Sequence, residues 1–530
     1  MGLVSILTIL GIIPLVGSVI VGFTPTKDVA RAKIIALVFA VATFVVAVVA
    51  VVGFDPNSAE PFQYVAQHDW IPALGISFAV GVDGIGLILV FLATLLVPVV
   101  IWAGWNDVEE AGEQSPGQTQ GNVRGYFALM LVLEAMMIGV FVSLDVVLFY
   151  IFFEVILIPV YFMIGRYGTG RRTYAAVKFL VYSLLGGLIM LAALAGLWYV
   201  SLQNFGGANM YFPDLLSMDI DPTVQGWLFW GFFIAFAIKA PLWPVHTWLP
   251  DAAGSSTPGT ATLLIGVLDK IGTFGMLRLC LPLFPEASQQ YAPVIIAISV
   301  IGIFYGALVA IGQSDMKRMF GYVSISHFGF MTMGIFAFTS VAQTGATFYM
   351  LGHGLSTAML FLVAGYLISR RKSAQVTDFG GVVNVAPVAA GLFLIAGLSA
   401  LALPGFMTFQ AEFLVLVGTF ERYAWVAAFS TLAIILAALY ILFMYQRSMT
   451  GPTSEGVKGF KDLNFRERWA IAPLVVVLIG LGFYPSPAMN VINPAVERTM
   501  EWVGATNPPP AIADATAEAT PSDSVEGSAR

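Results

Sequence analysis

The sequence contains very little cysteine and histidine for its 530 residues. Its single cysteine, Cys280, excludes a disulfide framework, and it also excludes an iron–sulfur cluster, which needs about four thiolate ligands. Four histidines are a thin supply for haem or metal sites, and no glycine-rich dinucleotide fingerprint follows a strand-like run. We therefore expect no metal and no cofactor in this chain, and we expect any redox chemistry to belong to partner proteins.

Charged residues are also scarce, at 10% of the chain against 58% hydrophobic residues. So few polar groups cannot cover a water-facing surface, which excludes a soluble protein. The apolar stretches are long enough for helices of about 20 residues that cross the bilayer. The sequence predicts an all-α polytopic membrane protein with about 14 transmembrane helices, at 3–21, 34–53, 78–102, 126–144, 146–165, 177–200, 226–244, 260–281, 292–312, 319–339, 345–368, 386–419 with a break, 424–446 and 469–487.

Basic residues alternate between the loops of this arrangement. The odd-numbered loops carry Lys27, Arg31, Lys33, Arg124, Arg166, Arg171, Arg172, Lys317, Arg318, Arg370, Arg371, Lys372, Arg447, Lys458, Lys461, Arg466 and Arg468. The even-numbered loops and both termini carry only Arg422, Arg498 and Arg530. Because positive loops stay in the cytoplasm, we expect a multi-pass protein of the inner (plasma) membrane with both termini outside the cytoplasm.

Two segments do not look like membrane spans. Residues 106–122 are acidic and rich in Gln and Gly, which favours a mobile loop. The last residues, 503–530, consist mainly of Pro, Ala, Ser, Thr and acids and cannot bury a core. We expect a membrane domain over 1–502 and a disordered external tail over 503–530.

Several titratable residues lie inside the apolar spans, where a charge costs about 2.5–3.5 kcal/mol on insertion scales. Thirteen uncharged residues, 226–238, precede Lys239 and place it deep in its span. Lysine, glutamate and histidine can change protonation near neutral pH when they are buried, as a proton relay requires. The candidates for such a relay are Glu134, Glu154, Lys239, Asp269, Lys270, His327, His353 and Glu412.

Some of these groups have a structural alternative. A neutral imidazole at His327 or His353 could simply hydrogen-bond a backbone carbonyl in the helix bundle. Glu134 lies one or two turns from the start of its span, so a structural role is equally reasonable there. Asp269 adjoins Lys270, but neighbours point about 100° apart around a helix and need not touch.

Proline interrupts two of the spans beside a buried charge. Lys239 is followed by Pro241 and Pro244, and Pro404–Gly405 precedes Glu412. His246 is a further candidate, seven residues after Lys239, although the prolines make a shared helix face unsafe to assume. Broken helices in corresponding positions of two halves are typical of inverted-repeat transporters. We therefore expect broken helices 7 and 12 and two inverted five-helix repeats, at about 126–281 and 292–446.

Five motifs around these residues resemble the antiporter-like subunits of respiratory NADH:quinone oxidoreductase, complex I. They are FEVILIPVYFMIG (153–165), IKAPLWPVHTWLPDA (238–252), GVLDKIGTFGMLR (266–278), SISHFGFM (324–331) and LPGFMTFQAEF (403–413). The segment GVDGIGLILVFLATLLVPV (81–99) is similar to the subunit M branch of that family. The similarity extends over nearly the whole chain apart from the tail.

The resemblance implies a role for each matching residue. Glu154 and Lys239 match an ion pair that couples neighbouring half-channels, Lys270 and His327 match the central relay, and Glu412 matches the titratable group on the exit side. The sister subunits L and N typically carry lysine at that last position, so glutamate favours subunit M.

The sequence departs from the family pattern at two places. Residues 253–257, Ala-Gly-Ser-Ser-Thr, stand where the family usually has histidine, an acid or serine, and alanine. The role of that histidine is therefore not carried over. Asp269 occupies a position that is more often aliphatic.

The resemblance thus implies a proton-translocating membrane-arm subunit of the oxidoreductase. It also implies that NADH, quinone, flavin and iron–sulfur clusters bind to partner subunits, and that the antiporter-like subunits L and N are neighbours. No nucleic-acid partner is expected. The alternatives are a component of a multisubunit cation/proton antiporter, a membrane-bound hydrogenase subunit, and an organic-solute transporter, and the proteins that copurify would distinguish them.

Overall fold

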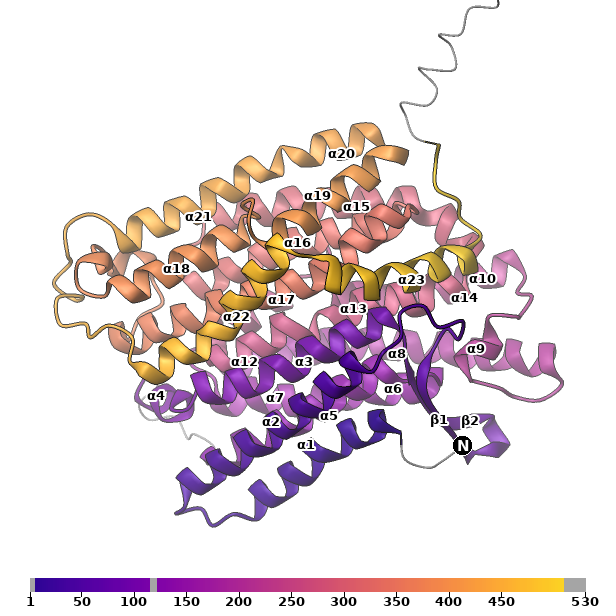
Figure 1. The fold of residues 1–530 in the computed structure, drawn as a ribbon, viewed down its shortest axis with the longest axis horizontal. Coiled ribbons are helices and arrows are strands. Elements are labelled where there is room, and N and C mark those ends of the chain that lie inside the picture. The colour runs from indigo at the N-terminus through magenta and orange to yellow at the C-terminus, as the bar shows by residue number, and fades with distance from the viewer. Residues whose placement is uncertain (1–4, 115–121, 510–530) are drawn as a thin grey trace, which may run out of the picture.

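A computed structural model describes residues 5–114 and 122–509 of the chain. Long helices lie side by side along the longest dimension of the molecule (Figure 1). The most buried of them are α3 (Gly84–Ala103), α16 (Met316–Phe336) and α17 (Ser340–Arg371), which pass through the centre. The least buried, α1 (Ile6–Phe23), α2 (Val29–Val52) and the pair α20 (Ala424–Thr431) and α21 (Ala433–Met449), form opposite edges in Figure 1.

The order of long and broken helices repeats along the chain. The first set of five comprises α5 (Val123–Val142), α6 (Val146–Val155) with α7 (Leu157–Tyr167), α8 (Arg172–Phe205), α10 (Pro222–Lys239) with α11 (Trp248–Ser255), and the interrupted helix of α12 (Pro258–Leu263), α13 (Lys270–Gly275) and α14 (Leu281–Leu283). The second comprises α15 (Pro285–Ile311), α16, α17, α18 (Pro387–Ala400) with α19 (Met407–Arg422), and α20 with α21. In each set the third helix is the longest and the fourth is broken. Five is an odd number, so the second set starts from the opposite face.

Both expected breaks occur at the predicted prolines. Helix α10 ends at Lys239, two residues before Pro241, which has no backbone N–H to continue the helix. Helix α18 ends at Ala400, and the chain turns through Pro404 and Gly405, whose φ of +105° suits glycine. The predicted inverted-repeat, broken-helix fold is thus confirmed.

Ten helices in the described residues are long and apolar enough to cross a membrane. The count becomes eleven if α22 (Phe465–Phe483) and α23 (Ser486–Val503), bent by 72°, are one span. The remaining predicted spans, at 226–244, 260–281 and 386–419, fall on segments that break into separate helices. The number fourteen therefore stays a prediction.

The structure corrects the sequence reading at two loops. An antiparallel hairpin of β1 (Gln63–Ile71) and β2 (Ile76–Val82) precedes α3, so the span expected from residue 78 begins at Gly84, after the helix cap Asp83. The acidic segment expected to be a mobile loop forms the helix α4 (Asp107–Gln114). Residues 115–121 of that loop and 510–530 of the expected tail lie outside the described residues.

The loops gather at two opposite ends of the molecule. At one end the odd-numbered, basic loops meet: Arg124 donates to the carbonyl of Thr24, and Lys317 donates to that of Ser256 at 2.9 Å. At the other end the even-numbered loops meet both ends of the described chain: Ser5 donates to the carbonyl of Tyr64, and Arg422 donates to that of Thr506 at 2.7 Å. We call these ends the basic face and the opposite face.

Candidate functional site

Lys239 lies at the last position of α10, where the helix breaks, and is 1% exposed. Within the described chain its ammonium has no hydrogen-bond partner. It rests instead against two aromatic rings, 4.7 Å from the centroid of Phe153 and 5.9 Å from that of Phe179. A cation held by ring faces keeps some stabilisation while its three donors stay free to bind water or a proton acceptor.

Glu154 lies near the end of α6, where the helix breaks before α7. Its carboxyl group occupies the space beside Gly187 of α8, because a Cβ atom built on that glycine would lie 1.7 Å from Glu154 Oε1. Glu154 and Lys239 act on each other electrostatically, but no ion pair within 4.0 Å joins them. The expected pair is therefore separated in this conformation.

Lys270 begins α13 between two π-helical segments, Leu264–Leu268 and Met276–Cys280. Such wide turns leave backbone carbonyls without their usual partner and are frequent at functional sites. One of these carbonyls, that of Ile265, accepts from Lys270 Nζ at 2.5 Å. The same Nζ atom lies 2.7 Å from His353 Nδ1, so the lysine and the histidine share a hydrogen bond.

Asp269 is fully buried, and neither of its carboxyl oxygens has a hydrogen-bond partner among the described residues. It interacts electrostatically with both Lys270 and Lys239. An acid in this position acts on both the lysine at the end of α10 and the lysine at the start of α13.

Side chains continue from His353 to Glu412 without interruption. The ring centroids of His353 and His327 are 5.1 Å apart, and those of His327 and Tyr349 are 5.6 Å apart. Tyr349 donates its hydroxyl hydrogen to Glu412 Oε2 at 3.0 Å. Tyr440 adds a second hydroxyl, 3.5 Å from His327 Nε2. We call the set Lys270, His353, His327, Tyr349 and Glu412 the central line.

Two predicted residues lie apart from the central line. Glu134 is fully buried, and its carboxyl oxygens find no hydrogen-bond partner in the described part of the chain. His246 packs edge-on against Tyr305, with ring centroids 4.8 Å apart, and neither ring nitrogen has a described partner. No hydrogen bond, ion pair or ring contact joins either residue to the central line within the described chain.

Tyr349 of the central line and the neighbouring Tyr440 were not identified from the sequence. Tyr349 precedes His353 by four residues, which places both on one face of α17, and this spacing was a usable signal. Tyr440 had no such signal because it lies alone in an apolar stretch.

A charged cluster beside the break between α10 and α11 was also missed. Asp251 bridges two cations, with Oδ2 2.7 Å from Lys178 Nζ and Oδ1 2.5 Å from an Arg318 nitrogen. Lys178 stands in the first turn of its predicted span, where it could have been noticed as a charge at the membrane edge. The cluster fixes α11 against α8 and α16 at the basic face.

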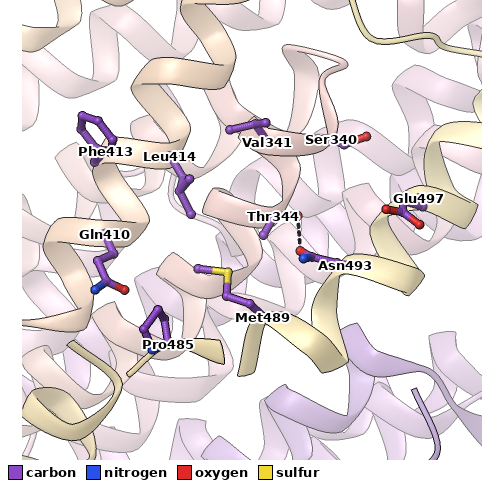
Figure 2. Close-up of a pocket in the computed structure, with 10 residues that line it drawn as sticks. All are labelled: Ser340, Val341, Thr344, Gln410, Phe413, Leu414, Pro485, Met489, Asn493 and Glu497. Atoms are coloured by element: carbon purple, nitrogen blue, oxygen red, sulfur yellow. Dashed lines mark hydrogen bonds between the residues drawn. The ribbon is translucent and has the colours of Figure 1, made fainter. Parts of the chain in front are cut away.

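A groove of about 450 Å³ opens beside α19 toward the opposite face (Figure 2). Its walls come from α17, α19 and the amphipathic helix α23, and Thr344 and Asn493 hydrogen-bond across it at 3.0 Å. On α19 the groove is lined by Gln410, Phe413 and Leu414. Glu412 lies about 160–200° around the helix from Gln410 and Leu414, so its carboxyl group points away from the groove and toward Tyr349.

Known proteins match this chain over nearly its whole length. Residues 143–437 match the family model described as "NADH:quinone oxidoreductase/Mrp antiporter, TM". NADH-quinone oxidoreductase subunit M of Mycobacterium tuberculosis is 48% identical over 532 residues, with 96% of each chain covered. The subunit M of Rhodobacter capsulatus is 38% identical, with 94% of this chain and 96% of the relative covered.

Solved structures agree with these relatives. A chain of respiratory complex I from Thermus thermophilus is similar with a TM-score of 0.84 and 28% identity, covering 94% of this chain and all of that one. A chain of the Mrp complex from Dietzia has a TM-score of 0.81, but at 19% identity it shows only the shared fold. The chain belongs to the family of NADH-quinone oxidoreductase subunit M, the antiporter-like membrane-arm subunit of respiratory complex I.

Proposed function

We propose that this subunit itself conducts protons across the membrane and that the central line is the inner part of its path. The observation that carries the proposal is the unbroken series of contacts from Lys270 through His353, His327 and Tyr349 to Glu412. Every member is a lysine, histidine, tyrosine or glutamate, which can bind and release a proton, and none is an arginine. All five side chains are buried, so protons on them are separated from the solvent.

Lys239, Glu154 and Asp269 supply the coupling in this proposal. Glu154 lies apart from Lys239, while Asp269 acts on both lysines. Movement of Glu154 toward Lys239 would stabilise the Lys239 ammonium group. The electrostatic interaction of Lys239 with Asp269 would then matter less. A change of charge beside Glu154 in a neighbouring subunit would in this way alter the proton affinity of the central line. Glu134 and His246 remain secondary candidates.

The partner subunits carry the electron transfer in this proposal. Flavin and iron–sulfur clusters belong to them, and the antiporter-like subunits L and N are the direct neighbours. The complex lies in the inner (plasma) membrane with the basic face toward the cytoplasm, as the loop charges favour. A Ser528→Cys variant in a Cys280→Ala background should then react with a membrane-impermeant thiol reagent on intact cells, and reaction only after the membrane is opened would reverse this orientation.

Two alternative functions exist. The likeness to the Mrp fold is consistent with a component of a multisubunit cation/proton antiporter, and the second alternative is a subunit of a membrane-bound hydrogenase. Copurification separates the three cases. If the subunit belongs to an NADH:quinone oxidoreductase, the complex purified in mild detergent should contain flavin and iron and should oxidise NADH.

Glu412 provides the test of the proton path. Glu412→Asp keeps a titratable group and should retain part of the NADH-driven proton pumping in inverted vesicles, whereas Glu412→Gln should lose most of it. The amount of assembled complex is measured in both variants as the control. Equal and near-normal pumping by both assembled variants would contradict the proposed path.

A further inference from the structure

The acidic helix α4 lies at the basic face and reaches the body of the helix bundle. Asp107 accepts a hydrogen bond from the backbone N–H of Gly259 at 2.9 Å, which ties α4 to the first turn of α12. This turn directly follows residues 253–257, where the family pattern and this sequence differ. A carboxyl group from another loop thus stands beside the segment that lacks the family's histidine.

Two small cavities adjoin Asp107, with about 10 Å³ and about 20 Å³ of space for water centres. Volumes of this size hold about one water molecule each when polar groups line them. Both cavities are lined by Asp107 and Glu110 of α4 and by Ser369 of α17. The two carboxyl groups therefore stand at the junction of two water-sized chambers.

An independent feature indicates that these chambers hold water or a proton carrier. The hydroxyl group of Tyr366 lines the first chamber, and the residue is only 7% exposed. This hydroxyl has no hydrogen-bond partner in the described chain. A buried hydroxyl without a partner costs about 1–3 kcal/mol, and a water molecule in the chamber would supply the missing bond.

Polar groups lead from the chambers toward the central line on two helices. On α12, the hydroxyl group of Thr260 shares a hydrogen bond with that of Tyr126, which also hydrogen-bonds the hydroxyl group of Thr257. Five residues beyond Thr260, about 7.5 Å along a helix, the carbonyl of Ile265 binds Lys270. On α17, the buried hydroxyl of Ser356 has no described partner and lies one turn from His353, on the side of the chambers.

Building on the proposed function, we propose that Asp107 and Glu110 form the proton-uptake site that loads the central line from the basic face. A proton taken from the solvent rests on one of these carboxylates and passes through chamber water toward Thr260 and Ser356. No bond other than O–H or N–H forms or breaks in this transfer. The proton leaves one carboxylate oxygen and arrives on the next base.

The charges around Asp107 suit this task. The titratable and charged groups that face Asp107 and Glu110 are Glu109 on α4, Tyr126 on α5, Lys317 on α16, Tyr366 and Lys372 at the end of α17, and Arg466 and Glu467 on α22. Burial raises the pKa of Asp107 to about 7, although the bond from Gly259 lowers it. Burial also raises the pKa of Glu110. Asp107 is therefore loaded below about pH 7 and loses its proton as the pH rises through that value.

The test compares Asp107→Asn with Glu455→Gln in the intact complex. Asparagine keeps an oxygen that can accept from Gly259, so the change removes the titratable group while preserving the bond. Glu455 is the control because it is an exposed carboxylate at the basic face that lines neither chamber and pairs with the exposed Lys458 at 2.5 Å. NADH-driven quinone reduction and proton pumping are measured from about pH 6 to about pH 8.5, where a carboxylic proton carrier of this pKa changes state.

We expect Asp107→Asn to be near normal at about pH 6 and on the order of tenfold slower at about pH 8.5, where protons reach the chambers rarely without a carrier. Added formate, a small carboxylic acid, should restore part of the quinone reduction rate. Glu455→Gln should follow the unmodified complex at every pH. Adding Glu110→Gln should deepen the defect of Asp107→Asn.

Three results would overturn the uptake site: a normal rate in the double variant at every pH, a loss that is independent of pH and unaffected by formate, or the same loss in Glu455→Gln. The first of these, together with impaired pumping in Glu412→Gln, would reject the uptake site while leaving the proposed function intact. Normal pumping in Glu412→Gln would instead reject the proposed function.

Discussion

At the scale of single residues, the charged groups next to the central line share one property. Lys239, Glu154 and Asp269 each have a buried polar atom without a hydrogen-bond partner in the described chain. Leaving such atoms unpaired costs about 1–3 kcal/mol each, and more when the group is charged. A fold retains such a cost where the group has to change its partner or its proton during function.

Gly187 gives a prediction about the position of Glu154. A methyl group at Gly187 would overlap the Glu154 carboxyl group, at 1.7 Å from Oε1. Gly187→Ala should therefore displace that carboxyl group and reduce NADH-driven quinone reduction by about tenfold to a hundredfold, as misplacement by about 1 Å can do. The α8 helix itself should not suffer, because alanine favours a helix over glycine by about 0.5–1 kcal/mol.

Gly391→Ala is the matched control, since a Cβ atom at Gly391 would meet nothing within 4 Å. Both variants should assemble to the same level, and only Gly187→Ala should turn over slowly. Normal turnover of Gly187→Ala would mean that the position of the Glu154 carboxyl group does not matter for coupling.

At the scale of helices and strands, the sequence predicts two kinds of feature: helix breaks caused by proline, and charged residues buried in apolar spans, which are rare because inserting a charge into the membrane is costly. The break after Lys239 follows from Pro241, and the deep position of Lys270 follows from the apolar residues around it. The π-helical turns on both sides of Lys270 have no local sequence signal, because they depend on packing. Gly272 is part of that packing, since a Cβ atom there would lie 2.5 Å from the backbone nitrogen of Ala240.

The same reasoning explains what was predicted wrongly. Composition assigned α4 to a loop because Glu, Gly and Gln are common there, yet Asp107 is held by Gly259 from a distant part of the chain. The strand β2 was assigned to a membrane helix because its residues are apolar and continue into α3. Tyr349 was overlooked because a tyrosine counts as apolar, while its role depends on the one hydroxyl that meets Glu412.

The ion pair of Asp83 and Arg278 gives a prediction about assembly. Arg278, in the second π-helical segment, lies 2.5 Å from Asp83, the N-cap residue of α3, and both side chains are buried. Asp83→Asn keeps a capping oxygen but leaves the guanidinium without its counter-charge, at a cost of about 3–5 kcal/mol. We expect much less assembled subunit in the membrane, measured by immunoblot after mild detergent extraction.

Asp28→Asn is a suitable control, because Asp28 caps α2 at an exposed position and, among the described residues, its side chain accepts only from the N–H of Arg31. This variant should assemble normally. Normal amounts of the Asp83→Asn subunit, with unchanged thermal stability of the complex, would contradict a structural role for the buried pair.

At the scale of the whole molecule, the proposed path leads from the basic face into the buried middle of the bundle. Helix α4, which carries Asp107 and Glu110, lies at the basic face (Figure 1), and the central line occupies the middle. The groove beside α19 opens at the opposite end (Figure 2), and the carboxyl group of Glu412 points away from it. Lys239 and Glu154 lie beside this path rather than along it. This arrangement suits coupling, because a change of charge beside Glu154 would alter the proton affinity of the path without blocking it.

The central claim is that proton movement through this subunit is coupled to electron transfer elsewhere in the complex. The most direct measurement is NADH-driven quinone reduction by assembled Glu154→Gln, Lys239→Ala and double variants, with ferricyanide reduction as the control because it draws electrons before the membrane arm is needed. Both single variants should slow quinone reduction while ferricyanide reduction stays near normal. The double variant should be no slower than the worse single one, because residues that act as one unit are non-additive. Normal quinone reduction and pumping in the single variants, or losses that multiply in the double variant, would contradict the account.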